Sequence, residues 1–235
     1  MLGSMTGSMT DPRPVPPTRV SPHVLGLPVR EPRALLAAVG LLLAYYVATM
    51  ARDLSLYDSG ELALAAVQLG LGHPPGQPLH TLFGFVLSRI PLWSPLFGVG
   101  LASAIPAALT LVPATSLAHA LLRDDTHVAY VRAIPFVLAI MAMHAALWEP
   151  ATRVEVYALS TFFEVWACAR LATRTGDARR DVMLVGQAGL ALGLCASVNP
   201  RIALYTAFAV APQLLVCLFS RRLSPWAIGS AIAGG

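Results

Sequence analysis

Long apolar segments recur along this chain from residue 34 onward, and they restrict it to a small set of folds. Of its 235 residues, 56% are hydrophobic and 12% are charged, whereas a soluble domain carries about a quarter charged residues. The shortage of charge is spread along the chain and is not confined to one anchor. Because a bilayer offers no partners to backbone polar groups, such segments cross it as helices. The sequence therefore predicts an all-α polytopic integral membrane protein.

The apolar segments also set the expected domain organisation. Stretches near bilayer-spanning length lie at residues 34–51, 96–122, 133–148, 155–172, 182–199 and 202–219. A shorter stretch, 80–93, is expected to be re-entrant or interfacial, and a further apolar run begins near Pro225. We therefore predict about six or seven transmembrane helices with a helical first external loop. Residues 1–33 are rich in proline and are expected to form a disordered cytoplasmic tail. Residues 34–235 form the membrane domain, and we expect it to be truncated because it stops within an apolar run.

The basic residues indicate an orientation. All 16 are arginine, and they lie singly or in pairs at the ends of apolar segments, which argues against nucleic-acid binding. With a cytoplasmic N-terminus, twelve fall on the inner side and four on the outer side, as the positive-inside rule requires. The four outer arginines are Arg52, Arg89, Arg153 and Arg201. The polar residues that we consider for chemistry then all lie on the outer face of the membrane.

The first external loop carries two carboxylates, Asp58 and Glu61. Three residues apart, they share one face of a helix, and a carboxylate fixed on a helix start suits general base catalysis. The same spacing ahead of an apolar stretch is also a helix capping box, and both interpretations stay open. His73 follows in a turn rich in glycine and proline, where we expect it to make a hydrogen bond, whereas His80 is expected to contribute little. Because no third ligand accompanies these histidines, we expect no metal and no cofactor.

Two further polar segments lie between spans. Arg153, Glu155 and Tyr157 form either a solvated hairpin with interfacial aromatics or a site for an anionic head group and a sugar. Asn199 and Arg201 offer a second candidate site for a phosphate.

Other polar residues lie within the apolar segments themselves. Glu164 lies in the middle of a span and should face the bundle, with His119 or His144 as possible partners. Three cysteines lie in apolar helices and are interpreted as small core residues. They are Cys168, Cys195 and Cys217.

Three motifs in fixed order carry a resemblance to a known family. Asp58-Ser59-Gly60-Glu61-Leu62, then His73-Pro74-Pro75-Gly76, then Glu155-Val156-Tyr157-Ala158-Leu159 resemble an uncharacterised bacterial family related to the eukaryotic transmembrane protein O-mannosyltransferases. The likeness covers residues 34–200. The chain departs from that family at Asn199-Pro200, where an Asn-His pair is frequent, and at Gln77, where an aromatic residue is common. Family chains also continue well past this length.

The resemblance implies a GT-C-like fold and a glycosyltransferase of the bacterial cytoplasmic membrane with its active face outside. Such enzymes take a sugar from a polyprenyl-phosphate carrier, here for a hydroxyl of a protein or glycan acceptor. By the same resemblance, Asp58 is the acidic residue of the first loop, and Glu61 stands beside it. We expect Glu61 and Glu155 to hold sugar hydroxyls or tune Asp58, and Arg52, Arg153 or Arg201 to neutralise the departing phosphate. The alternatives are a transporter for a lipid carrier or solute, and a non-catalytic membrane scaffold.

Overall fold

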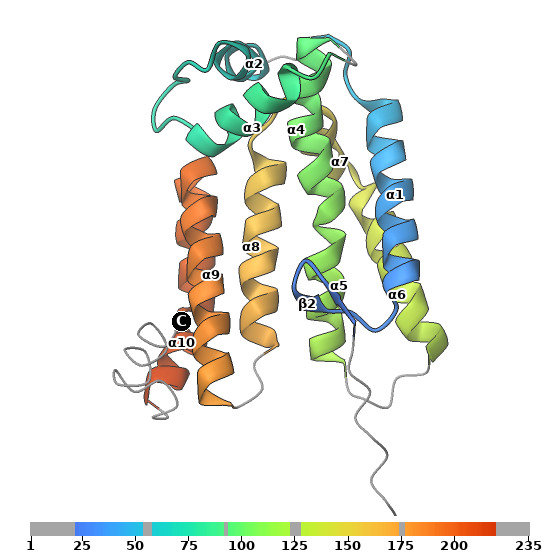
Figure 1. The fold of residues 1–235 in the computed structure, drawn as a ribbon, viewed down its shortest axis with the longest axis vertical. Helices are drawn as coiled ribbons and strands as arrows, with labels where there is room; N and C mark the ends of the chain where they lie inside the picture. Colours follow the sequence, from blue (N-terminus) through green and yellow to red (C-terminus); the bar gives the residue numbers. More distant parts are fainter. Residues whose placement is uncertain (1–21, 54–57, 92–93, 123–127, 174–176, 220–235) are drawn as a thin grey trace, which may run out of the picture.

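The computed structural model describes residues 22–53, 58–91, 94–122, 128–173 and 177–219. These residues form ten helices and one two-stranded hairpin (Figure 1). The helices are α1 (Pro32–Thr49), α2 (Ser59–Gln68), α3 (Pro78–Ser88), α4 (Pro95–Leu109), α5 (Leu111–Leu121), α6 (Val128–Ala142), α7 (Ala145–Thr152), α8 (Tyr157–Ala172), α9 (Ala178–Val198) and α10 (Pro200–Phe219). The hairpin pairs β1 (His23–Val24) with β2 (Leu27–Pro28) in antiparallel fashion. The expected all-α fold class is confirmed.

The long helices run side by side, and the first loop covers one end of them. Figure 1 shows α1, α4 with α5, α8, α9 and α10 roughly along one axis, with α2 and α3 across the top and the hairpin near the opposite end. Within the described residues, three helices are long and apolar enough to cross a membrane, at Pro32–Thr49, Pro95–Leu121 and Arg179–Val198. A fourth is added if α6 and α7, which are bent by 76°, count as one broken span.

Within the part of the chain that the structure describes, fewer spans qualify than the six or seven that we expected for the whole sequence. α8 explains part of the difference, because its 16 residues rise only about 24 Å and the apolar core of a bilayer is about 30 Å thick. The predicted span 133–148 is also wrong in its bounds, since α6 ends at Ala142 and α7 starts at Ala145. His144 lies in this break as the N-cap of α7, and its Nδ1 accepts the Ala146 N–H at 3.3 Å.

The end of the segment expected to be a disordered tail is instead folded. Residues 22–30 include the hairpin, whose turn places Leu25 and Gly26 at positive φ. Leu27 and Val29 are buried in the same apolar cluster as α1 and α5. Arg170 of α8 donates hydrogen bonds to the carbonyl oxygens of Gly26 at 2.7 Å and Leu25 at 3.1 Å. These contacts stabilise a segment whose proline content alone favours disorder. Residues 1–21 lie outside the described part of the chain.

Close packing around α4 holds the first loop in place. A Cβ on Gly98 of α4 would lie 2.5 Å from the carbonyl oxygen of Leu87, so only glycine lets α3 cross α4 at this distance. On its other side, α2 buries Leu62, Ala63 and Ala66 in an apolar cluster with residues of α4, α8 and α9. Because α2 and α3 are both attached in this way, the polar loop between them faces the starts of α8 and α10.

Candidate functional site

Asp58 stands at the start of α2 with its side chain free of the helix. It is the N-cap residue of α2, but its carboxylate makes no hydrogen bond to the backbone of the first turn. Glu61 does not reach back to Asp58 either; it binds His73, twelve residues further on. The capping-box interpretation therefore fails in its hydrogen bonds, and the Asp58 carboxylate, which is 61% exposed, is available to other partners.

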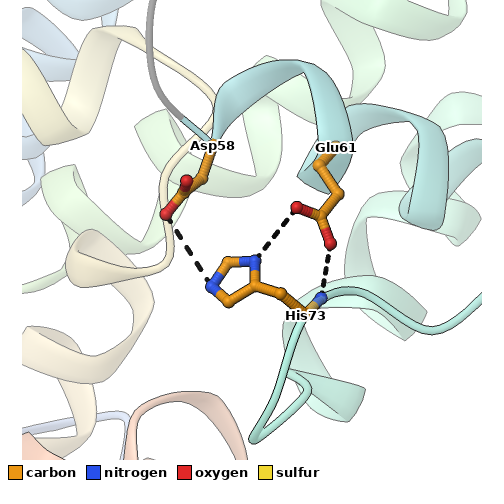
Figure 2. Close-up of polar contacts among 3 residues, drawn as sticks. All are labelled: Asp58, Glu61 and His73. Carbon is orange, nitrogen blue, oxygen red and sulfur yellow. Dashed lines mark hydrogen bonds and ion pairs between the residues drawn. The ribbon is translucent and has the colours of Figure 1, made fainter.

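His73 lies between the two carboxylates (Figure 2). Its backbone N–H donates to Glu61 Oε1 at 2.5 Å, and its ring Nδ1 lies 3.2 Å from Glu61 Oε2. On the other edge of the ring, Nε2 lies 3.8 Å from Asp58 Oδ2. The expectation that His73 makes a hydrogen bond agrees with these contacts. Figure 2 also shows that the carboxylates approach opposite edges of the ring, so they do not converge on one point.

Gly72 leaves room for this arrangement. A Cβ at that position would lie 3.1 Å from Gln77 Oε1 and 3.7 Å from Glu61 Oε1. The backbone of the loop thus passes directly beside two polar side chains. The turn that follows is closed by a hydrogen bond of 2.8 Å from the Gly76 N–H to the His73 carbonyl oxygen. Together these features fix the position of the His73 ring relative to α2.

A polar cavity of about 340 Å³ joins the first loop to the starts of α8 and α10. Residues far apart in the sequence meet in its wall. Six of the predicted site residues line it, namely Asp58, His73, Glu155, Tyr157, Asn199 and Arg201. Four of these six come from the second and third polar segments, so the structure brings those segments to the first loop.

Three predicted site residues do not line the cavity. Glu61 stands behind His73 and contacts it directly. Arg153 pairs with Glu149 at 3.4 Å between Nη2 and Oε1. Arg52 lies over the ring of Phe97, 5.1 Å from its centroid.

Asn199 immediately precedes α10, and Arg201 lies in its first turn. Asn199 Oδ1 accepts the Ile202 N–H at 3.3 Å, and Pro200 occupies the first helical position, which needs no N–H partner. Asn199 is therefore a helix cap as well as part of the cavity wall. Arg201 is exposed and, among the residues that the structure describes, it forms no ion pair. Its guanidinium is available to an anion in the cavity.

Two residues of this region carried no strong sequence signal. Ser103, buried in the apolar helix α4, donates its hydroxyl to the Glu155 carbonyl at 3.0 Å and accepts the Glu155 N–H at 3.1 Å. It thereby fixes the backbone of Glu155, and only its polarity within an apolar span hinted at a role. Gln77 lines the cavity, and its buried Oε1 has no hydrogen-bond partner in the described structure. Its departure from the family pattern was the one indication in the sequence.

The carboxyl of Glu155 is partly withdrawn from water. Burial raises its pKa, the neighbouring Asp58 raises it further, and Arg153 acts in the opposite direction. In the folded protein Glu155 therefore keeps its proton to higher pH than in the unfolded chain.

This pKa shift makes the stability of the folded protein depend on pH. The folded state binds more protons than the unfolded chain as the pH rises above about 4.5, the ordinary value for glutamate, so its free energy of unfolding falls over that interval. Glu155→Gln is neutral throughout and should remove this part of the fall. Thermal unfolding of both proteins in detergent between pH 4 and pH 7 measures the difference. A wild-type melting temperature that changes with pH in parallel with that of the variant would contradict the prediction.

The remaining polar residues lie apart from the cavity. His80 is buried with neither ring nitrogen hydrogen-bonded in the described structure, and burial lowers its pKa to about 4, so it is neutral at pH 7. No hydrogen bond or ion pair joins Glu164 to His119 or His144 within the described residues. Cys195 is buried and Cys168 half-buried, as expected of core residues, and the side chain of Cys217 lies outside the described part.

Comparison with known proteins identifies the relatives of this chain. The family described as protein O-mannosyl-transferase TMEM260 N-terminal domain matches residues 58–224. The protein O-mannosyl-transferase TMEM260 of Mus musculus is 29% identical over 178 residues, which cover 69% of this chain and 23% of the mouse protein. The protein O-mannosyl-transferase tmem260 of Dictyostelium discoideum is 44% identical over 45 residues, which cover 19% of this chain and 6% of that protein.

The chain thus spans less than a quarter of the mouse relative. No solved structure matches it. The match with the family includes all three motifs, from Asp58 to the segment after Glu155, and confirms the relationship to the eukaryotic O-mannosyltransferases that these motifs predicted. The chain belongs to the family of the protein O-mannosyl-transferase TMEM260 N-terminal domain.

Proposed function

We propose that this chain is the sugar-transferring domain of a membrane glycosyltransferase. It moves a sugar from a polyprenyl-phosphate donor to a hydroxyl of a protein or glycan acceptor on the outer face of the membrane. The observation that carries the proposal is one cavity lined by both the Asp58 carboxylate, which makes no hydrogen bond to its own helix, and the Arg201 guanidinium, which forms no ion pair within the described residues. Glycosyl transfer from a phosphate needs both, because an acceptor proton must leave and a phosphate must depart with its negative charge.

The part of the cavity that Arg201 lines suits a phosphate. Arg201 offers two parallel N–H donors to phosphate oxygens. The cavity is also lined by Val156 and Tyr157 at the start of α8 and by Pro200 at the start of α10. Helix starts carry partial positive charge and unpaired N–H groups, which favour an anion. The departing phosphate can therefore leave without a proton.

The part of the cavity that Asp58 lines suits the acceptor hydroxyl. The acceptor oxygen attacks the anomeric carbon, the bond from that carbon to the phosphate oxygen breaks, and the hydroxyl proton passes to the Asp58 carboxylate. A single displacement of this kind inverts the anomeric centre. Glu155 and Tyr157 line the same cavity, and we expect them to hydrogen-bond sugar hydroxyls. The pKa of Glu155 is raised by burial and by Asp58, so the carboxyl can donate as well as accept such bonds up to a higher pH than an exposed glutamate.

A second, apolar cavity of about 230 Å³ supports a lipid-linked donor. Leu79 and Phe83 of α3, residues 105, 106 and 109 of α4, and Leu159, Phe162 and Phe163 of α8 line it. Residues close together in the sequence line the two cavities. Gln77 lines the polar cavity and Leu79 the apolar one, and in the same way Tyr157 lines the polar cavity and Leu159 the apolar one. A phosphate held at Arg201 would thus have an apolar site nearby for the first isoprene units of its carrier.

The proposal includes a location and secondary roles for two arginines. The arginine distribution favours a cytoplasmic N-terminus and an outer cavity, and the proposed location is a bacterial cytoplasmic membrane, as the sequence resemblance implies. In support, Figure 1 shows the hairpin before α1 at the end of the bundle opposite to α2 and α3. Arg153, which lowers the pKa of Glu155, adjusts that carboxyl, and Arg52 is adjacent to the first loop without lining the cavity.

A transfer assay with the full-length protein tests this function. Proteoliposomes receive radiolabelled polyprenyl-phosphate mannose, glucose or arabinose, and in parallel the corresponding nucleotide sugars, with a peptide or glycan acceptor. We expect label in the acceptor from one lipid-linked donor and none from the nucleotide sugars. Liposomes without protein are the control. Donor that crosses the bilayer without transfer would support the transporter, and no donor movement of either kind would support the scaffold.

A further inference from the structure

Glu61 holds His73 at two points, and this determines where the ring carries its proton. One Glu61 oxygen accepts the backbone N–H of His73 at 2.5 Å, and the other lies 3.2 Å from Nδ1. An ionised carboxylate has only acceptors, so Nδ1 must carry the hydrogen of that contact. A neutral imidazole has one N–H, which leaves Nε2 with a free lone pair. Figure 2 shows Nε2 directed at Asp58.

The distance between His73 Nε2 and Asp58 Oδ2 agrees with two hydrogen-bond acceptors that face each other. Nε2 lies 3.8 Å from Asp58 Oδ2, beyond hydrogen-bond length. Once Asp58 has taken a proton from the acceptor hydroxyl, it becomes a donor. A rotation of the exposed Asp58 side chain would then bring Oδ2 to a hydrogen-bond distance of about 2.7–2.9 Å from His73 Nε2. The geometry thus changes from repulsive to bonding only after the chemical step.

We propose that His73 relays the acceptor proton from Asp58 to solvent, and that Glu61 is the positioning residue that sets the ring for this transfer. The inference rests on the proposed function. In the first step the acceptor O–H bond breaks and an Asp58 O–H bond forms. In the second step that O–H bond breaks and an Nε2–H bond forms on His73, which restores the Asp58 carboxylate for the next turnover. The Nε2 proton then passes to water, since the His73 side chain is 40% exposed.

The flanking carboxylates stabilise the intermediate of this relay. While His73 carries both protons it is a cation between the negative charges of Glu61 and the restored Asp58. All three side chains are half exposed, which gives the proton a path to water. Glu61 does not line the cavity, so it acts through His73 and touches no substrate.

The Glu61→Gln variant distinguishes a proton relay from a contact that only holds the loop against α2. A glutamine keeps one oxygen for the His73 backbone N–H, but its amide N–H faces Nδ1, which must then accept. The hydrogen moves to Nε2 and faces Asp58, so the relay is blocked while both hydrogen bonds remain. Asp177→Asn is the control, because it also replaces a carboxylate by an amide, but at the start of α9, at the opposite end of the bundle, where asparagine also caps.

The first readout is the position of the ring proton, which needs no turnover. The full-length protein with ¹⁵N-labelled histidine is studied by NMR in nanodiscs, and a His73→Gln spectrum assigns the His73 signals among those of the other histidines. We expect the Nδ1–H form in the wild type and in Asp177→Asn, and the Nε2–H form in Glu61→Gln. An Nε2–H form in the wild type would overturn the proposal.

The second readout is kinetic. We expect kcat of Glu61→Gln to fall by about 10²- to 10⁴-fold with little change in the donor KM, as for loss of a proton-transfer group. His73→Ala should lose kcat similarly and regain part of it with added imidazole. A wild-type kcat in Glu61→Gln despite the changed ring proton would overturn the relay. Absence of transfer by the wild type would instead contradict the proposed function, and the NMR result would still decide whether Glu61 sets the ring.

Discussion

Asp58→Asn is expected to reduce the kcat of sugar transfer by about 10²- to 10⁴-fold, with the donor KM close to that of the wild type. Asparagine has the shape of aspartate but cannot take the acceptor proton at neutral pH. The change should not disturb α2, because the Asp58 side chain makes no hydrogen bond to the first turn and asparagine is itself a good N-cap. Initial rates over a range of donor concentrations, at matched expression, measure both constants.

Asp53→Asn provides the matched control for this experiment. It makes the same chemical exchange at an exposed position five residues earlier, and Asp53 does not line the cavity. Its kcat should equal that of the wild type. Equal transfer by Asp58→Asn and Asp53→Asn would remove Asp58 from the mechanism and leave it as a residue at a helix start.

Arg201→Gln is expected to lower kcat by about 10²- to 10³-fold, the usual effect of removing one donor that stabilises charge in a transition state. The donor KM should rise as well, because the donor already carries a phosphate charge. Arg201→Lys should recover part of kcat, since lysine restores the charge but not the pair of parallel N–H donors. The same assay with polyprenyl-phosphate sugar measures each variant.

Arg180→Gln controls for the loss of a positive charge. Arg180 is exposed in the first turn of α9, at the end of the bundle opposite to the cavity. Its activity should be unchanged. If Arg153→Gln, and not Arg201→Gln, lost kcat, the phosphate would be held by Arg153, and the pair that it forms with Glu149 would have to open.

The fold was largely predictable because apolar segments of the right length have few alternatives to helices. The errors arise where one side chain redirects the backbone. His144 starts α7 with its own ring nitrogen, a competition that hydropathy does not register. Likewise, the hairpin before α1 is held by Arg170, which lies more than a hundred residues away in the chain. Long-range contacts of this kind leave no local pattern.

The sequence predicted which residues lie near the candidate site better than it predicted which hydrogen bonds they make. The arginine distribution put the polar segments on one side of the membrane, and the structure brings Asp58, Glu155 and Arg201 to one cavity. The partner of Glu61 was not predictable, because a capping box and a bond to His73 start from the same spacing of residues. The structure distinguishes them: the loop folds back at Gly72 and brings His73 against the Glu61 side chain.

The first loop and the start of α10, which both contribute to the cavity, differ in how early they can form. Glu61 and His73 are twelve residues apart, so their contact closes a short loop at a small entropy cost. Arg201 belongs to α10, and it can meet the first loop only after the intervening helices have been made and packed. Since domains fold progressively from the N-terminus during synthesis, the proton-handling cluster can exist long before the anion site. A chain released before α10 would have a base and no place for phosphate. Among the described helices, α10 is the one synthesised last, and it completes the cavity.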